Sequence, residues 1–155
     1  MSLNDEVETL RKVPLFRGIE PAKLKLLAFT SERTTFEAGQ YLMRQGEDAS
    51  CAYLIIEGEA EITREINGQS VFVAALGANN FVGEMAILMD QPRSATVCAK
   101  SQLCTLKITK DCFFQLIDDF PRIAIELMRV LAQRLETTTA DLIRARSIDN
   151  PAADN

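Results

Sequence analysis

Residues 81–97 read FVGEMAILMDQPRSATV, and this stretch decides how the rest of the chain is interpreted. A strand that ends at Gly83 runs into a segment too short for an ordinary helix, which Pro92 closes before another strand begins. Inside a β-barrel, such a break turns backbone N–H groups inward at the start of the short segment, where they suit an anion such as phosphate. Gly83 also allows the backbone to approach a ligand closely.

Two charged residues of this stretch are candidates for ligand binding. Arg93 precedes a strand of small and β-branched residues, so we expect it to be partly buried, and a buried guanidinium needs an anionic partner. A phosphate would accept bidentate hydrogen bonds from Arg93, and Ser94 would add a hydroxyl donor. Glu84, which only accepts when ionised, suits a ribose hydroxyl nearby. Spacing alone leaves an equal alternative, a structural salt bridge between Glu84 and Arg93 over an empty barrel.

Outward from this stretch, glycines divide the preceding segment at intervals of 6 to 12 residues between Gly39 and Gly83. Short strands bounded by turns at this spacing are typical of an all-β sandwich or barrel. Asn67-Gly68 is a hairpin signal. The predicted strands are 52–57, 60–66, 70–76, 95–99 and 103–108. Strand 70–76 is apolar on both faces, so one face can pack in the core while the other needs a helix or a ligand to cover it.

Helices are predicted at both ends of the chain. They cover residues 3–12, a segment that opens at Glu20-Pro21, residues 111–119 and residues 121–146. On the last helix, a seam alternates at spacings of three and four residues: Met128, Leu131, Leu135, Thr138, Leu142 and Ala145. This heptad pattern is typical of a helix that packs along a partner helix. The seam is short, so packing on the chain's own barrel stays an alternative.

Composition excludes several kinds of site. The chain has 155 residues, a formal charge of −5 and no histidine, which removes Ser-His-Asp and Cys-His catalysis and imidazole-held metals. The acidic balance argues against nucleic acid as the main partner. The spacing of the four cysteines fits no metal or redox motif and indicates unpaired thiols in a reducing compartment. Without a long apolar run or a signal peptide, the sequence predicts a cytoplasmic protein that does not span a membrane.

The stretch 81–97 resembles the phosphate-binding cassette of cyclic-nucleotide-binding domains. In that cassette, aromatic–x–Gly–Glu–apolar–Ala–apolar is followed by Pro–Arg–small–Ala–x–Val, and every element is present here. The resemblance extends to segments 15–18, 36–41, 45–47 and 53–58. It implies a mainly β fold with flanking helices: a jelly-roll (double-stranded β-helix) barrel of about eight antiparallel strands plus a C-terminal helical pair.

The resemblance also implies a division of the chain. We expect an N-terminal helical segment over 1–33 and a β-roll over 34–108 that holds the cassette 81–97. C-terminal helices over 109–147 and a disordered tail over 148–155 would follow. In catabolite activator proteins, a DNA-binding domain follows the long helix. Here only nine residues follow Arg146, so no nucleic-acid binding is expected from this chain.

The roles of individual residues follow from the resemblance. Arg93 would bind the cyclic phosphate, and Glu84 the ribose 2′-hydroxyl. The remaining positions expected in the ligand site are Val73, Val82, Gly83, Met85, Ala86, Ser94 and Ala95. The last helix is similar to that of the catabolite activator family, which implies that Arg134, Thr138 and Thr139 touch the base. For Thr138, a register-setting role in the heptad seam is an equal alternative.

The implied function is a cyclic-nucleotide sensor and not an enzyme, with cAMP or cGMP as its ligand and no metal. Binding would shift the helices over 111–146 against the barrel. A threonine after the phosphate-binding arginine often accompanies guanine binding in this family, and Ser94, which also has a hydroxyl, is less diagnostic. The expected ligand is cAMP, with cGMP second. The alternative is a ligand-free structural or protein-interaction module, against which the intact pair of Glu84 and Arg93 counts. A homodimer through helix 121–146 is the second expected partner.

Overall fold

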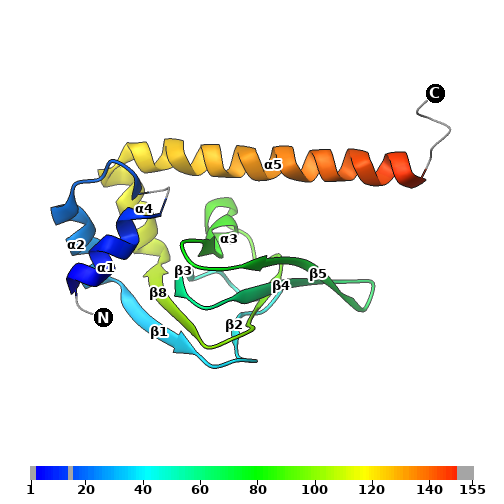
Figure 1. Cartoon of the computed structure of the whole chain (residues 1–155), viewed down its shortest axis with the longest axis horizontal. Helices are drawn as coiled ribbons and strands as arrows, with labels where there is room; N and C mark the ends of the chain where they lie inside the picture. Colours follow the sequence, from blue (N-terminus) through cyan, green and yellow to red (C-terminus); the bar gives the residue numbers. More distant parts are fainter. Residues whose placement is uncertain (1–2, 14–15, 150–155) are drawn as a thin grey trace.

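The computed structural model describes residues 3–13 and 16–149. In this part of the chain, eight strands form two four-stranded antiparallel sheets of a jelly roll, with helices at both ends (Figure 1). The strands are β1 (Glu32–Phe36), β2 (Tyr41–Met43), β3 (Cys51–Glu57), β4 (Ala60–Ile66), β5 (Gln69–Leu76), β6 (Phe81–Val82), β7 (Thr96–Ala99) and β8 (Leu103–Thr109). The helices are α1 (Leu3–Arg11), α2 (Pro21–Thr30), α3 (Glu84–Met89), α4 (Lys110–Asp119) and α5 (Pro121–Asp149).

In one sheet, in the order β1-β8-β3-β6, the inner strand β3 is buried on both faces from Cys51 to Ile55, while the edge strand β1 is largely exposed. Successive side chains of a strand point to opposite faces. On β3, Leu54 therefore joins a cluster with Phe113 and Ile123 of the helices, while Ile55 joins the core inside the barrel. Both side chains are fully buried. We call this sheet the covered sheet.

The other sheet, in the order β2-β7-β4-β5, is the open sheet. Its hairpin turns at Asn67 and Gly68, which both have positive φ (54° and 81°), as a two-residue turn of type I′ requires. The predicted hairpin is confirmed. The expectation that one face of β5 packs in the core is wrong for its outer part, where Val71, Phe72 and Val73 are exposed. The reason is that β5 is an edge strand in a hairpin that projects beyond the other strands (Figure 1).

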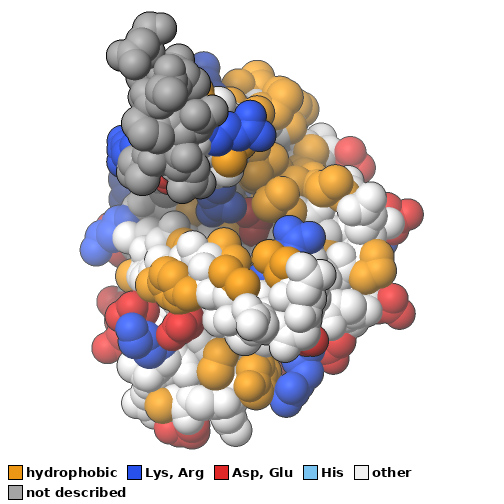
Figure 2. All heavy atoms as spheres, turned by 90° about the vertical axis from the view of Figure 1, so that its right-hand side faces the viewer, with side chains coloured by type: hydrophobic (Ala, Val, Ile, Leu, Met, Phe, Trp, Pro, Cys, Tyr) orange, Lys and Arg blue, Asp and Glu red, His pale blue; other side chains and the backbone are white. Residues whose placement is uncertain are grey.

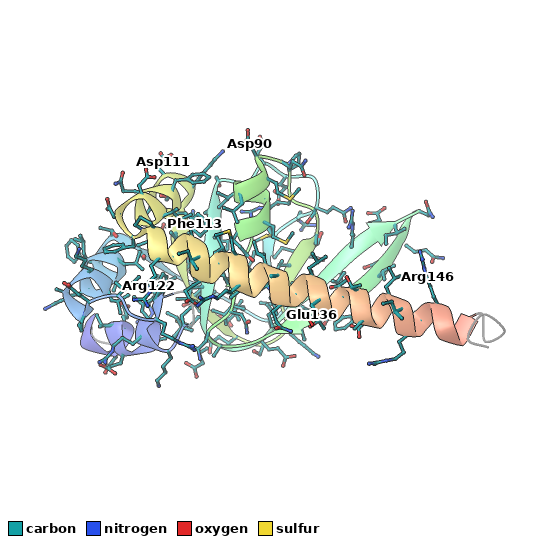
Figure 3. All side chains as sticks on the ribbon, turned by 90° about the horizontal axis from the view of Figure 1, so that it is seen from above. Asp90, Asp111, Phe113, Arg122, Glu136 and Arg146 are labelled. Carbon is teal, nitrogen blue, oxygen red and sulfur yellow. The ribbon has the colours of Figure 1, made fainter. Side chains whose placement is uncertain are left out.

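The long helix α5 begins on the covered sheet and ends over the open one. The Thr109 hydroxyl caps α4 by accepting from Cys112 N–H at 3.2 Å, and Ile123 and Leu127 anchor the first turns of α5 in the core. Seen from above, α5 crosses the barrel from Arg122 towards Arg146, above the β4–β5 hairpin (Figure 3). The seam residues Met128, Leu135 and Leu142 are exposed along it.

The observed elements differ from the predicted ones mainly at short or polar strands. The pattern missed β1, which is polar apart from Phe36, and β2, which has only three residues. The strand predicted to end at Gly83 is present as the two-residue β6. The helix α5 runs to Asp149, past its predicted end at 146. The rest of the predicted tail, 150–155, lies outside the described residues. The division into segments 1–33, 34–108 and 109–147 stays a prediction.

Candidate functional site

A cavity of about 240 Å³ lies between the inner face of the open sheet, α3 and α5. Ten of the twelve predicted site residues line it: Val73, Val82, Gly83, Glu84, Met85, Ala86, Arg93, Ser94, Ala95 and Arg134. Viewed from the hairpin side, hydrophobic and basic side chains gather around a hollow between α5 and the barrel (Figure 2). The structure therefore brings residues between 73 and 97 together with residue 134 around a single cavity.

Gly83 is the backbone hinge between β6 and α3. Its φ of +89° lies in the left-handed region, which favours glycine. A Cβ at this position would lie 2.5 Å from Arg93 Nη1 and 2.9 Å from Met43 Cε, so any side chain would collide with the guanidinium. The absence of a side chain lets the Gly83 carbonyl accept a hydrogen bond from Arg93 Nη1 at 2.8 Å.

Arg93 is a buried cation, only 5% exposed, as the sequence predicted. Its Nη2 donates to the Cys51 carbonyl, and its backbone is fixed by N–H donation to the Glu47 carbonyl at 2.8 Å and by acceptance from Gly46 N–H at 2.8 Å. The side chain donates to two neutral carbonyls and, from Nη2 at 3.9 Å, to the Cys51 sulfur. Within residues 3–13 and 16–149 no carboxylate pairs with Arg93. A buried guanidinium without an acidic partner, at the wall of a cavity, is suited to an anionic ligand.

Tyr53 does not supply the missing negative charge. Burial raises the pKa of its phenol well above the ordinary value, with a further rise from Cys51, and Arg93 only partly opposes these effects. The phenol therefore stays neutral at physiological pH.

Glu84 is the first residue of α3 and is 3% exposed. Its Oε1 accepts from Arg134 Nη1 of α5 at 2.8 Å. The alternative of a Glu84–Arg93 salt bridge is therefore wrong, because Arg93 is directed at the Gly83 and Cys51 carbonyls while α5 brings Arg134 to Glu84. Among the described residues the second carboxylate oxygen has no hydrogen-bond partner, which leaves it available to a ligand hydroxyl.

Two of the predicted base contacts do not line the cavity. Thr138 and Thr139 are both exposed on α5 beyond Arg134. Thr138 follows Arg134 by four residues and so lies on the same helix face. Thr139 is turned about 100° further around the helix, away from that face. Their contact with a base stays a prediction.

Sequence reasoning missed six lining residues, namely Met43, Ile62, Arg64, Leu76, Phe81 and Val97. Phe81 and Val97 stand in the quoted stretch but were not assigned to the site. Ile62 and Arg64 alternate on β4, opposite Ala74 and Val71. The register of the predicted hairpin carries a signal for both, because residues two apart on a strand share a face.

Metal and membrane features are not found in the described part of the chain. No group of three or more Cys, Asp or Glu side chains is placed to hold a metal ion there. Within the same residues, no helix has both the length and the apolar character needed to cross a membrane.

Comparison with known proteins agrees with this geometry. A family model described as "Cyclic nucleotide-binding domain" matches residues 33–120, from β1 through α4. The chain is 29% identical over 140 residues to the CRP-like cAMP-activated global transcriptional regulator of Mycobacterium tuberculosis, covering 88% of this chain and 62% of the regulator. It is 34% identical over 109 residues to the cAMP-dependent protein kinase regulatory subunit of Blastocladiella emersonii, covering 70% of this chain and 27% of that subunit.

The fold is shared with a solved regulator. The catabolite activator protein of Thermus thermophilus superposes with a TM-score of 0.77 at 28% identity, covering 86% of this chain and 63% of that one. The chain thus spans less than two thirds of each of these three proteins. By the match over its strands, its cassette and α4, the chain belongs to the cyclic nucleotide-binding domain family.

Proposed function

We propose that this chain is a non-catalytic regulatory domain that binds a cyclic nucleotide in the cavity, with cAMP preferred over cGMP. The observation that carries the proposal is Arg93, a buried cation at the cavity wall that has no acidic partner among residues 3–13 and 16–149. A cyclic phosphate carries one negative charge and two exocyclic oxygens, which match the guanidinium fork. The names of two relatives contain cAMP, which supports the same preference.

The lining residues suit the other parts of such a ligand. The free oxygen of Glu84 would accept from the ribose 2′-hydroxyl, and Ser94 would donate to the phosphate. Val73 and Val82 offer apolar surface to the sugar and the base. Met85 and Ala86, at the start of α3, close the same wall.

The ion pair between Glu84 and Arg134 supports a coupling between the ligand and α5. It joins the cassette to the long helix, with 2.8 Å between Arg134 Nη1 and Glu84 Oε1, although the two residues are 50 positions apart in sequence. A ribose hydroxyl that donates to Glu84 would compete with Arg134 for this carboxylate, and would thereby change the position of α5. Differential binding to two positions of α5 is what a two-state sensor requires.

A dimer through α5 is the second candidate role, and the exposed seam favours it. Met128, Leu135 and Leu142 recur every seven residues, and each is more than half exposed. An apolar stripe of this period is typical of a helix that packs along another. We expect Leu135→Lys to shift the protein to monomer in light scattering. Gln133→Lys, outside the seam, should not. Monomeric wild-type protein over the micromolar range would contradict a homodimer.

Calorimetric titration of nucleotide-stripped protein with cAMP and cGMP tests the proposed function. We expect micromolar or tighter binding of wild type, and a loss of about 2 kcal/mol or more in Arg93→Gln, as for a buried charge-assisted contact. Arg93→Lys keeps the charge and separates loss of the bidentate contact from loss of the fold. Thermal unfolding of each variant without ligand is the control. A folded, demonstrably empty wild type that binds neither nucleotide would favour the ligand-free module.

A further inference from the structure

Arg64 is a third guanidinium in the cavity, beside Arg93 and Arg134, and the proposed function gives it no role. It stands on β4, two residues after Ile62 and opposite Val71 in the hairpin register. Within the described residues it forms no ion pair and no side-chain hydrogen bond, and only one carboxylate, that of Glu84, lines the cavity. An arginine at the wall of a binding cavity with no protein partner is free to contact the ligand.

The other charges of the cavity are already matched. Arg134 is paired with Glu84, and Arg93 would take the cyclic phosphate, which is the only charged group of a cyclic mononucleotide. Arg64 is therefore left without an anionic counterpart on either the described protein or the ligand. The groups on the ligand that remain for Arg64 are neutral hydrogen-bond acceptors, and a purine base carries them on its edge.

Arg64 differs in exposure from the two charged residues proposed to hold the phosphate and the ribose. Arg93 and Glu84 are 5% and 3% exposed and mark the closed end, where the phosphate and the ribose would lie. Arg64 is exposed, on the hairpin that projects below α5 (Figure 1). A nucleotide held by its phosphate and ribose at the closed end directs its base towards this mouth.

We infer that Arg64 is a specificity-determining residue that reads the base edge and favours guanine, an inference that rests on the proposed function. Guanine presents O6 and N7 as two adjacent acceptors, which match the two parallel donors of a guanidinium. Adenine presents N7 beside the N6 amino group, a donor that faces the guanidinium without forming a bond. Arg64 thus raises the affinity for cGMP relative to cAMP, and so narrows the preference for cAMP given under the proposed function.

The test is titration of stripped wild type and Arg64→Gln with cAMP, cGMP and cyclic inosine monophosphate. The inosine nucleotide keeps O6 and N7 but lacks the 2-amino group of guanine. We expect Arg64→Gln to weaken cGMP and the inosine nucleotide about 10-fold each, the lower part of the range for a bidentate arginine–base contact. Binding of cAMP should not weaken, because a glutamine amide can pair with N6 and N7 of adenine. Arg64→Lys should lose most of the same selectivity, because a point charge lacks the fork.

Arg129→Gln is the matched control, since it removes the same charge from an exposed position of α5 outside the cavity. It should leave all three affinities unchanged. Equal weakening of all three nucleotides in Arg64→Gln, or no weakening, would overturn the inference while leaving the proposed function intact. Selectivity that persists in Arg64→Lys would overturn the bidentate contact. Wild type that binds none of the three would overturn the proposed function, and the role of Arg64 with it.

Discussion

The strands β3 and β5 contrast the two sides of the barrel. From Cys51 to Ile55, β3 is buried, with helices on one face and the barrel core on the other, whereas β5 is exposed from Gln69 to Val73 and lines the cavity at Val73. Both strands are apolar in sequence, so hydrophobicity alone does not distinguish them. The difference comes from their places in the sheets, interior for β3 and edge for β5. The covered sheet supplies stability, and the open sheet supplies surface that a ligand or a partner helix would cover.

The largest effect is expected on the covered sheet. Leu54→Ala removes a fully buried side chain between β3 and the helices, and should lower the free energy of unfolding by about 2–5 kcal/mol. Urea denaturation measures this change. Nucleotide affinity of the folded fraction should stay close to that of wild type. A loss below about 1 kcal/mol would show that the helices do not hold this sheet as described.

A smaller effect, on binding, is expected at the open side. Glu84→Gln keeps the shape of the side chain but removes its charge, so we expect cyclic-nucleotide affinity to fall about 10- to 100-fold, as for a hydrogen bond to a charged group. Calorimetry with 2′-deoxy-cAMP sharpens the result. That ligand lacks the hydroxyl, so wild type and Glu84→Gln should bind it about equally. If the variant instead binds cAMP as wild type does, Glu84 has no contact with the ribose.

A pH-dependent effect is expected at Tyr53, a buried residue of β3 in the covered sheet. Burial raises the pKa of this phenol, so the unfolded chain ionises first, at about pH 10. Above that pH the unfolded state binds fewer protons than the native state, and stability falls as the pH rises. The free energy of unfolding of Tyr53→Phe, measured by urea denaturation, should fall less steeply between pH 9 and 11 than that of wild type. Parallel curves for the two proteins would contradict the described burial of the phenol.

The smallest effect is expected at the exposed edge. Phe72→Ser removes a large apolar side chain that is 59% exposed, so the free energy of unfolding should change by no more than about 0.5 kcal/mol. The same urea series as for Leu54→Ala gives a direct comparison of β3 with β5. A loss of more than about 1.5 kcal/mol would mean that β5 is covered in solution, for instance by a second copy of the chain.

The sequence predicted the parts of the fold that depend on local chemistry. The turn at Asn67-Gly68, the burial of Arg93 and the break at Gly83 each follow from the conformational limits or the charge of single residues. The strand β1 was not predicted, because its sequence ERTTF does not alternate between apolar and polar residues. It forms a strand by pairing with β8. The local hydrophobic pattern of a segment does not predict which distant segment pairs with it.

The candidate site was predicted where it is continuous in sequence and missed where it is not. Gly83, Glu84 and Arg93 belong to one stretch and meet at one cavity wall. The partner of Glu84 was assigned wrongly in the salt-bridge alternative, because the approach of Arg134 depends on the path of α5. Arg64 was missed because its contribution depends on the register of the β4–β5 hairpin and on the cavity that the fold creates.

The central claim is that Arg93 is a buried cation held for a phosphate, and comparing adenosine with cAMP tests it most directly. The two ligands share the base and the ribose 2′-hydroxyl, and differ by the cyclic phosphate. Titration of stripped wild type should show cAMP binding at least about 30-fold tighter than adenosine, as expected for one buried charge-assisted contact. Arg93→Gln should reduce that ratio to near one. Equal affinities for adenosine and cAMP in wild type would contradict the account.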